Sequence, residues 1–349
     1  MKNNIKSWIE KKVELLCRKL ENNILSNKSL KCKVVFGPVR SRRLGFVLGV
    51  NNVKQKACSY NCVYCPAGKT SCCSVCTNYC LSPYELYLSV RKKLEEIEQS
   101  GKKIEYIVFA GSGEPTLDSS LSKEISLLRE FGYKIAVFTN ASLLWNDNIR
   151  ENLMFADYVS IKIDTAIEDT WFKINRPHRK LDYDVILSGI KQFSKNFSGT
   201  LTTETTFIKN LNDNVEEIEE LSKYFKEIKS DKFYFSTPIY PTEESRDVYP
   251  AEETMQKLSQ AVKEKIPNSF MLCCPEKDEF FATDDFENEL LGLLSLHPVN
   301  KDAVKNYIKD DLESETLNKL LKDNSIKEVV HNNKRFYTIE NQFQTVMNE

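Results

Sequence analysis

The chain alternates short apolar runs with amphipathic segments over most of its length. Six runs have the length and composition of β-strands, and stretches with helical periodicity separate most of them. The predicted strands are Gly45–Val50, Glu105–Ala110, Tyr133–Thr139, Tyr158–Ile163, Leu201–Ile208 and Lys232–Thr237. Continuously apolar runs such as the one around Val108 are typical of parallel strands that are buried on both faces. The alternation therefore predicts an α/β fold of parallel β/α units with right-handed crossovers.

The number of units limits the architecture. Six units are too few to close an eight-fold barrel, so the sequence predicts a partial (βα)6 barrel of the TIM type. The best-defined helix is expected at Tyr84–Glu98, with Ser82 as N-cap, Pro83 at the first helical position and Glu85 three residues after the cap. Functional side chains in such a barrel collect at the carboxyl ends of the strands. The motifs described below fall in loops at those ends.

The pattern changes from Asp285 onward. Helices are predicted at Phe286–Leu296, Lys301–Asp310 and Ser314–Lys322, and strands at Ile326–His331 and Lys334–Ile339. Asn332 and Asn333 suit a two-residue hairpin turn, so this part of the chain looks like a small winged-helix unit. Winged helices commonly bind DNA, but residues 311–323 carry four acidic side chains against two lysines, which phosphates would repel. We therefore expect this unit to contact a protein partner or to pack on the main domain.

These patterns divide the chain into four parts. Residues 1–33 are predicted as an N-terminal helix and a basic connector, 34–248 as the barrel core, 249–284 as a helical connector and 285–349 as the winged-helix-like unit. No apolar run approaches the roughly 18 residues needed to cross a bilayer, and the N-terminal segment lacks the apolar centre of a secretion signal. We therefore expect a cytoplasmic protein that does not contact membranes.

Charge is balanced over the whole chain but not along it. The sequence has 49 Lys and Arg against 50 Asp and Glu, so no bulk field attracts nucleic acid. From Asn22 to Tyr84, however, there is no acidic residue. The basic residues of this segment are Lys28, Lys31, Lys33, Arg40, Arg42, Arg43, Lys54, Lys56 and Lys69. This run predicts either a solvated basic face or a positive field around whatever the segment binds.

The same segment holds most of the cysteines, and in a reducing cytoplasm thiols are available to metals. Cys58, Cys62 and Cys65 lie within eight residues. Iron–sulfur clusters need soft thiolate ligands, and this short spacing lets one loop hold three corners of a cubane. The fourth iron would stay open, which marks a reactive centre rather than a structural one, by analogy with catalytic zinc.

Two other interpretations of the cysteines stay open at this point. Cys62 and Cys65 together with Cys73 and Cys76 form two Cys-x2-Cys knuckles, which favour a zinc-stabilised module that binds nucleic acid or protein through its basic loop and winged-helix tail. A second set of thiols would bind an auxiliary iron–sulfur cluster or zinc, or form a disulfide. This set consists of Cys72, Cys73, Cys76 and Cys80.

The arrangement Cys-x3-Cys-x2-Cys, with Tyr64 directly before the last cysteine, resembles the signature of the radical S-adenosylmethionine (SAM) superfamily. Four further segments resemble an iron–sulfur oxidoreductase branch that is grouped with the wyosine-base (tRNA) synthases. These segments are Phe36–Gly45, Gly111–Leu117, Thr139–Leu144 and Asn175–His178. The wyosine-base synthases carry auxiliary cysteines upstream of the triad, where this chain has only Cys17 and Cys32. The chain also shows no distinctive match to their pyruvate-binding lysine.

The resemblance implies a specific chemistry. The triad would bind a [4Fe-4S] cluster, and S-adenosyl-L-methionine would chelate the fourth iron. One electron from a donor of the ferredoxin or flavodoxin type would cleave SAM to methionine and a 5′-deoxyadenosyl radical, which abstracts hydrogen from a substrate. The substrate is unknown, and the basic segment beside the triad favours tRNA as a hypothesis.

The resemblance also implies roles for individual residues. Cys58, Cys62 and Cys65 would be the cluster ligands, and Tyr64 would lie near the adenine. The SAM-binding residues would further include Gly111, Ser112, Gly113 and Glu114, which resemble a Gly-Gly-Glu element, together with Asn140 and Asp164 at the ends of the third and fourth strands. Asn140 and Asp164 are equally typical of turns. Arg176 and His178 are candidate catalytic residues, able to pair with an anion or donate a proton, or else helix-terminus contacts.

Overall fold

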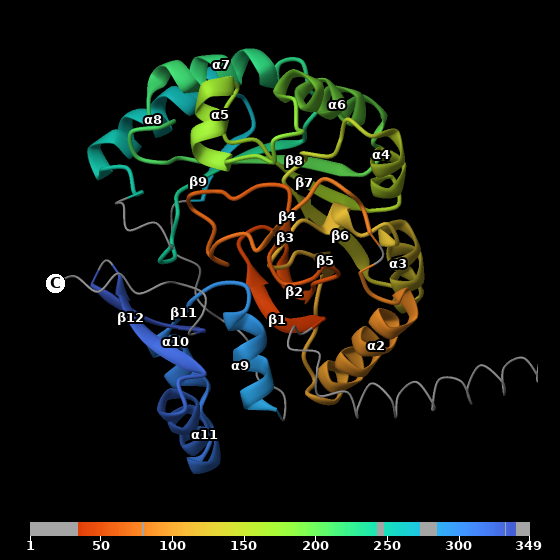
Figure 1. The fold of residues 1–349 in the computed structure, drawn as a ribbon, viewed down its shortest axis with the longest axis vertical. Coiled ribbons are helices and arrows are strands. Elements are labelled where there is room, and N and C mark those ends of the chain that lie inside the picture. The colour runs from red at the N-terminus through yellow and green to blue at the C-terminus, as the bar shows by residue number, and fades with distance from the viewer. Residues whose placement is uncertain (1–33, 79, 243–247, 273–284, 332, 340–349) are drawn as a thin grey trace, which may run out of the picture.

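The centre of the protein is an eight-stranded sheet (Figure 1). The computed structural model describes residues 34–78, 80–242, 248–272, 285–331 and 333–339. In order across the sheet, the strands are β1 (Val35–Ser41), β2 (Gly45–Val50), β5 (Tyr106–Phe109), β6 (Lys134–Thr139), β7 (Tyr158–Lys162), β8 (Thr200–Thr206), β9 (Lys232–Ser236) and β10 (Ser269–Leu272). Strands β2 to β10 run parallel, and β1 pairs antiparallel with β2. A separate short pair is formed by β3 (Ala57–Cys58) and β4 (Cys72–Cys73).

Helices follow the outside of the curved sheet (Figure 1). They are α2 (Pro83–Gln99), α3 (Leu121–Leu128), α4 (Asp147–Leu153), α6 (Tyr183–Asn196), α7 (Val215–Phe225) and α8 (Glu252–Lys265). One continuous apolar core joins the two layers, with Ile107 and Ile135 of the sheet packed in the same cluster as Leu86 and Phe193 of the helices. The predicted α/β fold is therefore confirmed, as an open, curved sheet of parallel β/α units.

All six predicted strands are present, and the sheet continues beyond them at both ends. The antiparallel edge strand β1 was not predicted because Gly37 and Pro38 interrupt its strand pattern. Proline lacks a backbone N–H and is tolerated at the edge of a sheet, which is where β1 lies. The parallel strand β10 falls in the range predicted as a connector and has only four residues. The sheet thus has seven parallel strands rather than six.

Helix α2 begins where the sequence predicts, but its cap differs. Ser82 is the N-cap and Pro83 the first helical residue, yet the Ser82 side chain makes no capping hydrogen bond. Its carbonyl oxygen accepts from the backbone N–H of Leu86 instead. A proline at the first helical position removes one of the N–H groups that a cap would otherwise satisfy.

Two arginine side chains in the turn between β1 and β2 bond to strands that lie far from β1 in the sheet. Arg42 donates from Nη1 to the backbone oxygen of Leu272 on β10, at 2.7 Å. Arg43 donates to Ser160 Oγ on β7 at 2.9 Å and forms an ion pair with Glu204 on β8, also at 2.9 Å. These two arginines therefore link the first strands of the sheet to its middle and its last strand across the inside of the curve.

The C-terminal unit consists of α9 (Phe286–Leu294), β11 (Val299–Asn300), α10 (Lys301–Tyr307), α11 (Asp311–Lys322), β12 (Ile326–His331) and β13 (Lys334–Ile339). The three strands form a sheet in the order β11-β13-β12, so the order of elements is that of a winged helix. Its apolar core includes Phe36 of β1, and Lys93 of α2 pairs with Glu289 of α9. The unit packs on the barrel next to β1 (Figure 1), while the predicted domain boundaries stay predictions.

The helix predicted within residues 1–33 lies outside the described residues. Among the helices of the described ranges, none combines the length and the apolarity needed to cross a lipid bilayer.

Candidate functional site

The three cysteines of the triad lie on one loop that follows β3. Cys58 is the last residue of β3, and Cys62 and Cys65 follow in the loop. All three are free and half-buried. The three cysteines are therefore partly covered by protein and partly accessible to solvent. A cluster with one open iron needs such access, because a ligand must reach that iron.

The triad loop is held by the last residues of α5 (Glu168–Asn175) and by the connector that follows this helix. The backbone N–H of Asn61 donates to the oxygen of Asn175 at 3.0 Å, and that of Val63 donates to the oxygen of Ile174 at 2.9 Å. Tyr60 and Pro177 also form an isolated antiparallel bridge. Because these bonds are between backbone groups, they fix the path of the loop independently of any ligand.

Each sulfur of the triad faces one side-chain hydrogen-bond donor. The donors come from three separate parts of the chain. The pairs are Asn140 Nδ2 to Cys58 Sγ at 3.5 Å, Asn175 Nδ2 to Cys62 Sγ at 3.4 Å and Lys56 Nζ to Cys65 Sγ at 3.2 Å. Neutral thiols are weak acceptors, whereas thiolates bound to iron carry charge and accept such bonds. The three donors therefore fit a cluster held by these sulfurs.

The protonation of the cysteines follows from their surroundings. Burial raises the pKa of Cys58 to about 12, and the nearby Glu114 carboxylate adds to the shift. Burial, followed by the charge of Asp164, also raises the pKa of Cys62. Without a metal these two groups are neutral thiols. Because metal binding requires thiolates, loading of a cluster here is coupled to proton release.

The two interpretations of the cysteines make different geometric demands. A zinc knuckle needs its ligands to converge on one ion, whereas the irons of a cubane lie at separate corners. Within the described ranges, no three Cys, His, Asp or Glu side chains are arranged to hold a single metal ion. The zinc interpretation stays a prediction. Cys72, Cys73 and Cys76 are exposed, and Cys80 is half-buried.

The predicted Gly111–Glu114 element packs directly against the start of the triad. The backbone N–H of Glu114 donates to the oxygen of Ala57 at 2.9 Å. A Cβ added at Gly113 would lie 2.1 Å from that same oxygen, so only glycine permits this close approach. Ser112 accepts from the backbone N–H of Lys56 at 3.3 Å. The element therefore brings its backbone beside the cysteines.

The Glu114 side chain has a structural role in this arrangement. Its buried carboxylate accepts from the hydroxyl groups of Thr116 and Thr139, both at 2.6 Å, and from the backbone N–H of Asn140 at 2.7 Å. Burial raises its pKa, and these donors oppose the shift. The carboxylate thus ties the loop after β5 to the end of β6 and sets the position of Asn140. The role of Glu114 in binding SAM stays a prediction.

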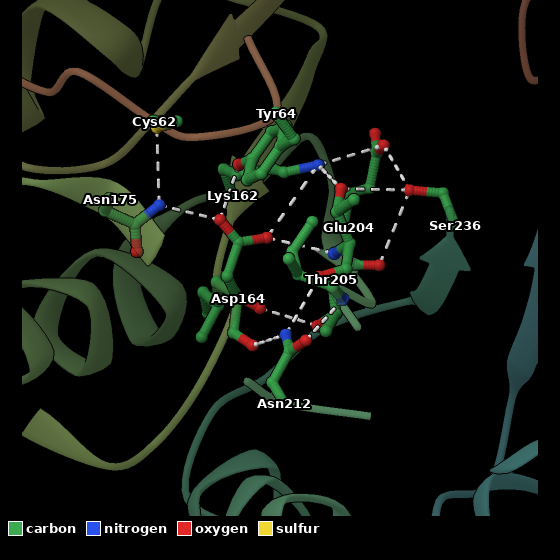
Figure 2. Close-up of polar contacts among 12 residues, drawn as sticks. Cys62, Tyr64, Lys162, Asp164, Asn175, Glu204, Thr205, Asn212 and Ser236 are labelled. Atoms are coloured by element: carbon green, nitrogen blue, oxygen red, sulfur yellow. Dashed lines mark hydrogen bonds and ion pairs between the residues drawn. The ribbon is translucent and has the colours of Figure 1, made fainter. Parts of the chain in front are cut away.

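Asp164 follows the end of β7, and its carboxylate contacts the Tyr64 hydroxyl (Figure 2). Its Oδ2 atom accepts from the Tyr64 hydroxyl at 2.5 Å and from Asn175 Nδ2 at 2.7 Å. Its Oδ1 atom accepts from the backbone N–H of Thr206 at 2.9 Å. Asp164 therefore aligns both the aromatic residue of the motif and the donor to Cys62. The sequence alone suggests a direct cofactor contact and does not show this role.

A largely buried group of charges lies beside Tyr64 and Asp164 (Figure 2). Glu204 on β8 pairs with Lys162 at 3.1 Å and with Arg43 at 2.9 Å, and it accepts from Ser236 Oγ at 3.0 Å. Burial raises the pKa of Glu204, but Lys162 and Arg43 outweigh it and hold that pKa well below its ordinary value. Lys162 Nζ also lies 5.1 Å from the centre of the Tyr64 ring, a cation–π contact that links the charges around Glu204 to the cysteine motif.

The candidate catalytic residues lie beside the triad loop. Arg176 ends α5 in a left-handed conformation, with φ of 43°, and its side chain is exposed. The backbone N–H of His178 donates to the oxygen of Ser59 at 2.9 Å, and its Nδ1 accepts from the backbone N–H of Lys180 at 3.2 Å. The structure brings both residues to the triad loop, and their catalytic role stays a prediction.

The basic segment is partly internal. Of its described basic residues, Arg42, Arg43 and Lys56 bind acceptors inside the protein, namely Leu272, Glu204 and the Cys65 sulfur. Arg40, Lys54 and Lys69 are exposed. Part of the positive charge of this segment is therefore directed into the protein, and part lies on the surface.

The close packing at Gly113 leads to a testable expectation. In Gly113→Ala, the new Cβ displaces the Ala57 backbone beside Cys58, and we expect the affinity for the cluster to fall roughly tenfold. Iron retained after anaerobic reconstitution and a chelator challenge measures this. Gly101→Asn is the control, because a Cβ there meets nothing within 4 Å and asparagine tolerates the left-handed backbone. Equal iron retention in the two variants would contradict the expectation.

Comparisons with known proteins agree with this geometry. The sequence profile of the radical SAM superfamily matches residues 52–225. A UPF0026 protein of Methanocaldococcus jannaschii is 35% identical over 307 residues, which cover 87% of this chain and 95% of the relative. The chain belongs to the radical SAM superfamily. Membership indicates an enzyme that uses SAM and implies a [4Fe-4S] cluster.

Other similar proteins extend the comparison. A Brachyspira hyodysenteriae protein named GTPase Obg is 30% identical over 332 residues, which cover 92% of this chain and 47% of that protein. The crystal structure of a radical SAM methyltransferase from Sphaerobacter thermophilus aligns with a TM-score of 0.53 at 16% identity, over 65% of this chain and 67% of that chain. The crystal structure of Streptococcus suis SuiB bound to precursor peptide SuiA aligns with a TM-score of 0.50 at 14% identity. This alignment covers 65% of this chain and 48% of the SuiB chain. At these identities, the two structures support the α/β fold alone.

Proposed function

We propose that Cys58, Cys62 and Cys65 hold a [4Fe-4S] cluster whose open iron binds SAM. The observation that carries this proposal is a single clamped loop with three half-buried sulfurs, each of which faces its own side-chain donor. When bound, the cluster would pass one electron from an external donor to SAM, releasing methionine, and so supply the site with the radical chemistry that abstracts hydrogen from a substrate.

The chain's own residues position these groups. Backbone bonds from Ile174 and Asn175 hold the triad loop, and Asp164 orients the Tyr64 ring through its hydroxyl. The half-exposed backbone around Gly111 and Gly113 offers amides and carbonyls beside Cys58, suited to the charged amino-acid end of SAM. An external one-electron donor of the ferredoxin or flavodoxin type completes the proposal.

Anaerobic purification tests this function. We expect a brown protein with about four irons per chain that converts SAM to 5′-deoxyadenosine when dithionite is added. A colourless protein that contains zinc and is inert toward SAM would contradict the proposal and favour the zinc-stabilised binding module.

We also propose an RNA substrate, with tRNA as the first to examine. Helix α5 and the connector after it add exposed cations beside the triad loop. These cations, together with Lys69 of the basic segment, are Lys173, Arg176, Arg179 and Lys180. Exposed lysine and arginine side chains around a reactive centre provide the electrostatic attraction that phosphate backbones require.

Cells with and without the gene allow this substrate proposal to be tested. We expect at least one modified nucleoside of tRNA to disappear when the gene is deleted and to return when the wild-type gene is restored, as measured by mass spectrometry of digested tRNA. An unchanged profile would contradict the RNA proposal, and it would leave the cluster assignment untouched.

A further inference from the structure

Lys56 is placed in an unusual position for a lysine. The residue is 7% exposed, its backbone is in the left-handed region with φ of 59°, and its ammonium lies 3.2 Å from Cys65 Sγ. Burial of an ammonium group is costly unless it faces negative charge. Within the described ranges, no Asp or Glu forms an ion pair with Lys56, and the Cys65 sulfur is the acceptor of its ammonium. The position is favourable when that sulfur is a thiolate.

The two asparagines are held so that their amino groups face sulfur. Asn140 Oδ1 accepts from the backbone N–H of Ser142 at 3.0 Å, which leaves Nδ2 directed at Cys58. Asn175 Nδ2 donates to the Asp164 carboxylate at 2.7 Å. A carboxylate only accepts, so this bond assigns the amide orientation and directs the same amino group at Cys62.

We propose that Lys56, Asn140 and Asn175 raise the reduction potential of the cluster by stabilising its three thiolates, with the largest effect from Lys56. This inference rests on the proposed function and extends it to residues outside the motif. Reduction adds one electron from an external donor, and the added negative charge spreads onto the sulfurs. Donors at those sulfurs stabilise the reduced state more than the oxidised state. A full positive charge has a larger effect than an amide dipole.

Potentiometric titration of the loaded enzyme, followed by the electron paramagnetic resonance signal of the reduced cluster, tests the proposal. At a fixed solution potential, we expect the ratio of reduced to oxidised cluster to fall about tenfold in Lys56→Met, which is about 59 mV for a one-electron couple. Lys56→Arg keeps the charge and the N–H donors and should recover most of the ratio. Lys54→Met removes an exposed positive charge two residues away and should leave the ratio unchanged.

Two further measurements cover the case in which Lys56→Met does not load a cluster. Asn140→Asp keeps the acceptor for Ser142 but turns an acceptor toward Cys58. It should therefore lower the ratio of reduced to oxidised cluster at least as much as Lys56→Met does. In wild-type enzyme labelled with ¹⁵N-lysine, pulsed electron paramagnetic resonance should detect a ¹⁵N coupling to the reduced cluster, and Lys56→Arg should lose it.

The outcomes separate the two proposals. A wild-type protein that binds no cluster contradicts the proposed function and this inference together. A loaded wild-type enzyme whose potential is unchanged in Lys56→Met and Asn140→Asp contradicts this inference alone, as does the absence of a ¹⁵N coupling.

Discussion

Serine in place of Cys62 is expected to abolish SAM cleavage and to prevent stable binding of the cluster. A serine oxygen is a hard ligand and a poor substitute for thiolate at an iron–sulfur centre. Cys62 also lies in the middle of the clamped loop, where Asn175 contacts its sulfur at 3.4 Å. After anaerobic reconstitution, we expect iron to fall from about four per chain to a small fraction of that, with no 5′-deoxyadenosine formed.

Cys76→Ser is the matched control for this experiment. Cys76 is exposed and lies outside the triad, so the variant should retain wild-type iron and SAM cleavage. Full iron and activity in Cys62→Ser would contradict the ligand assignment. Loss of iron in both variants would instead favour ligation by the paired knuckles.

Glu204→Gln is expected to lower the free energy of unfolding by about 3–5 kcal/mol. The substitution keeps the size of the side chain but removes the counter-charge of Arg43, and it leaves Lys162 with only the longer ion pair to Asp164 at 4.0 Å. Figure 2 shows Lys162 between these two carboxylates. The exposed fractions of the Arg43 and Glu204 side chains are 8% and 14%, so solvent screens this pair little. Urea denaturation of the protein without a cluster measures the change.

The surface pair between Lys191 and Glu227 provides the comparison. Its N–O distance is 2.6 Å, but 57% of the Glu227 side chain is exposed. We therefore expect Glu227→Gln to cost less than about 1 kcal/mol. If Glu204→Gln and Glu227→Gln lowered the free energy of unfolding equally, the stabilising role of Glu204 and its cations would be contradicted.

The effect of Glu204 also depends on pH in a definite direction. Its pKa in the folded protein is held below the ordinary value of 4.5. The stability that it contributes is therefore fully present above pH 4.5 and is lost as the pH falls toward the folded pKa. The difference in unfolding free energy between wild type and Glu204→Gln should thus narrow below pH 4.5, and a constant difference down to pH 3 would contradict this account.

Much of the fold can be read from local patterns. The predicted bounds of Gly45–Val50, Ile326–His331 and Lys334–Ile339 are those of β2, β12 and β13, because clear turn residues flank each strand. The sequence patterns do not predict β1 and β10, for two different reasons. Pro38 breaks the pattern of a strand that survives at the sheet edge, and Ser269–Leu272 is too short to show a period.

The candidate site is only partly local. The triad is visible in the sequence because its spacing within one loop carries the chemistry. Asn140 and Asn175 reach the sulfurs only through the crossovers that bring β6 and α5 to the loop. Lys162 and Glu204 look like ordinary polar positions of strands, and nothing near them in sequence reveals that Arg43 completes the group. Tertiary structure therefore decides which of the basic residues face inward.

The open iron is the central claim, and Mössbauer spectroscopy of ⁵⁷Fe-loaded protein with and without SAM tests it most directly. We expect added SAM to change the isomer shift of one iron site in four, because three sites are fixed by Cys58, Cys62 and Cys65. A spectrum in which every iron site is unaffected by saturating SAM would contradict the account.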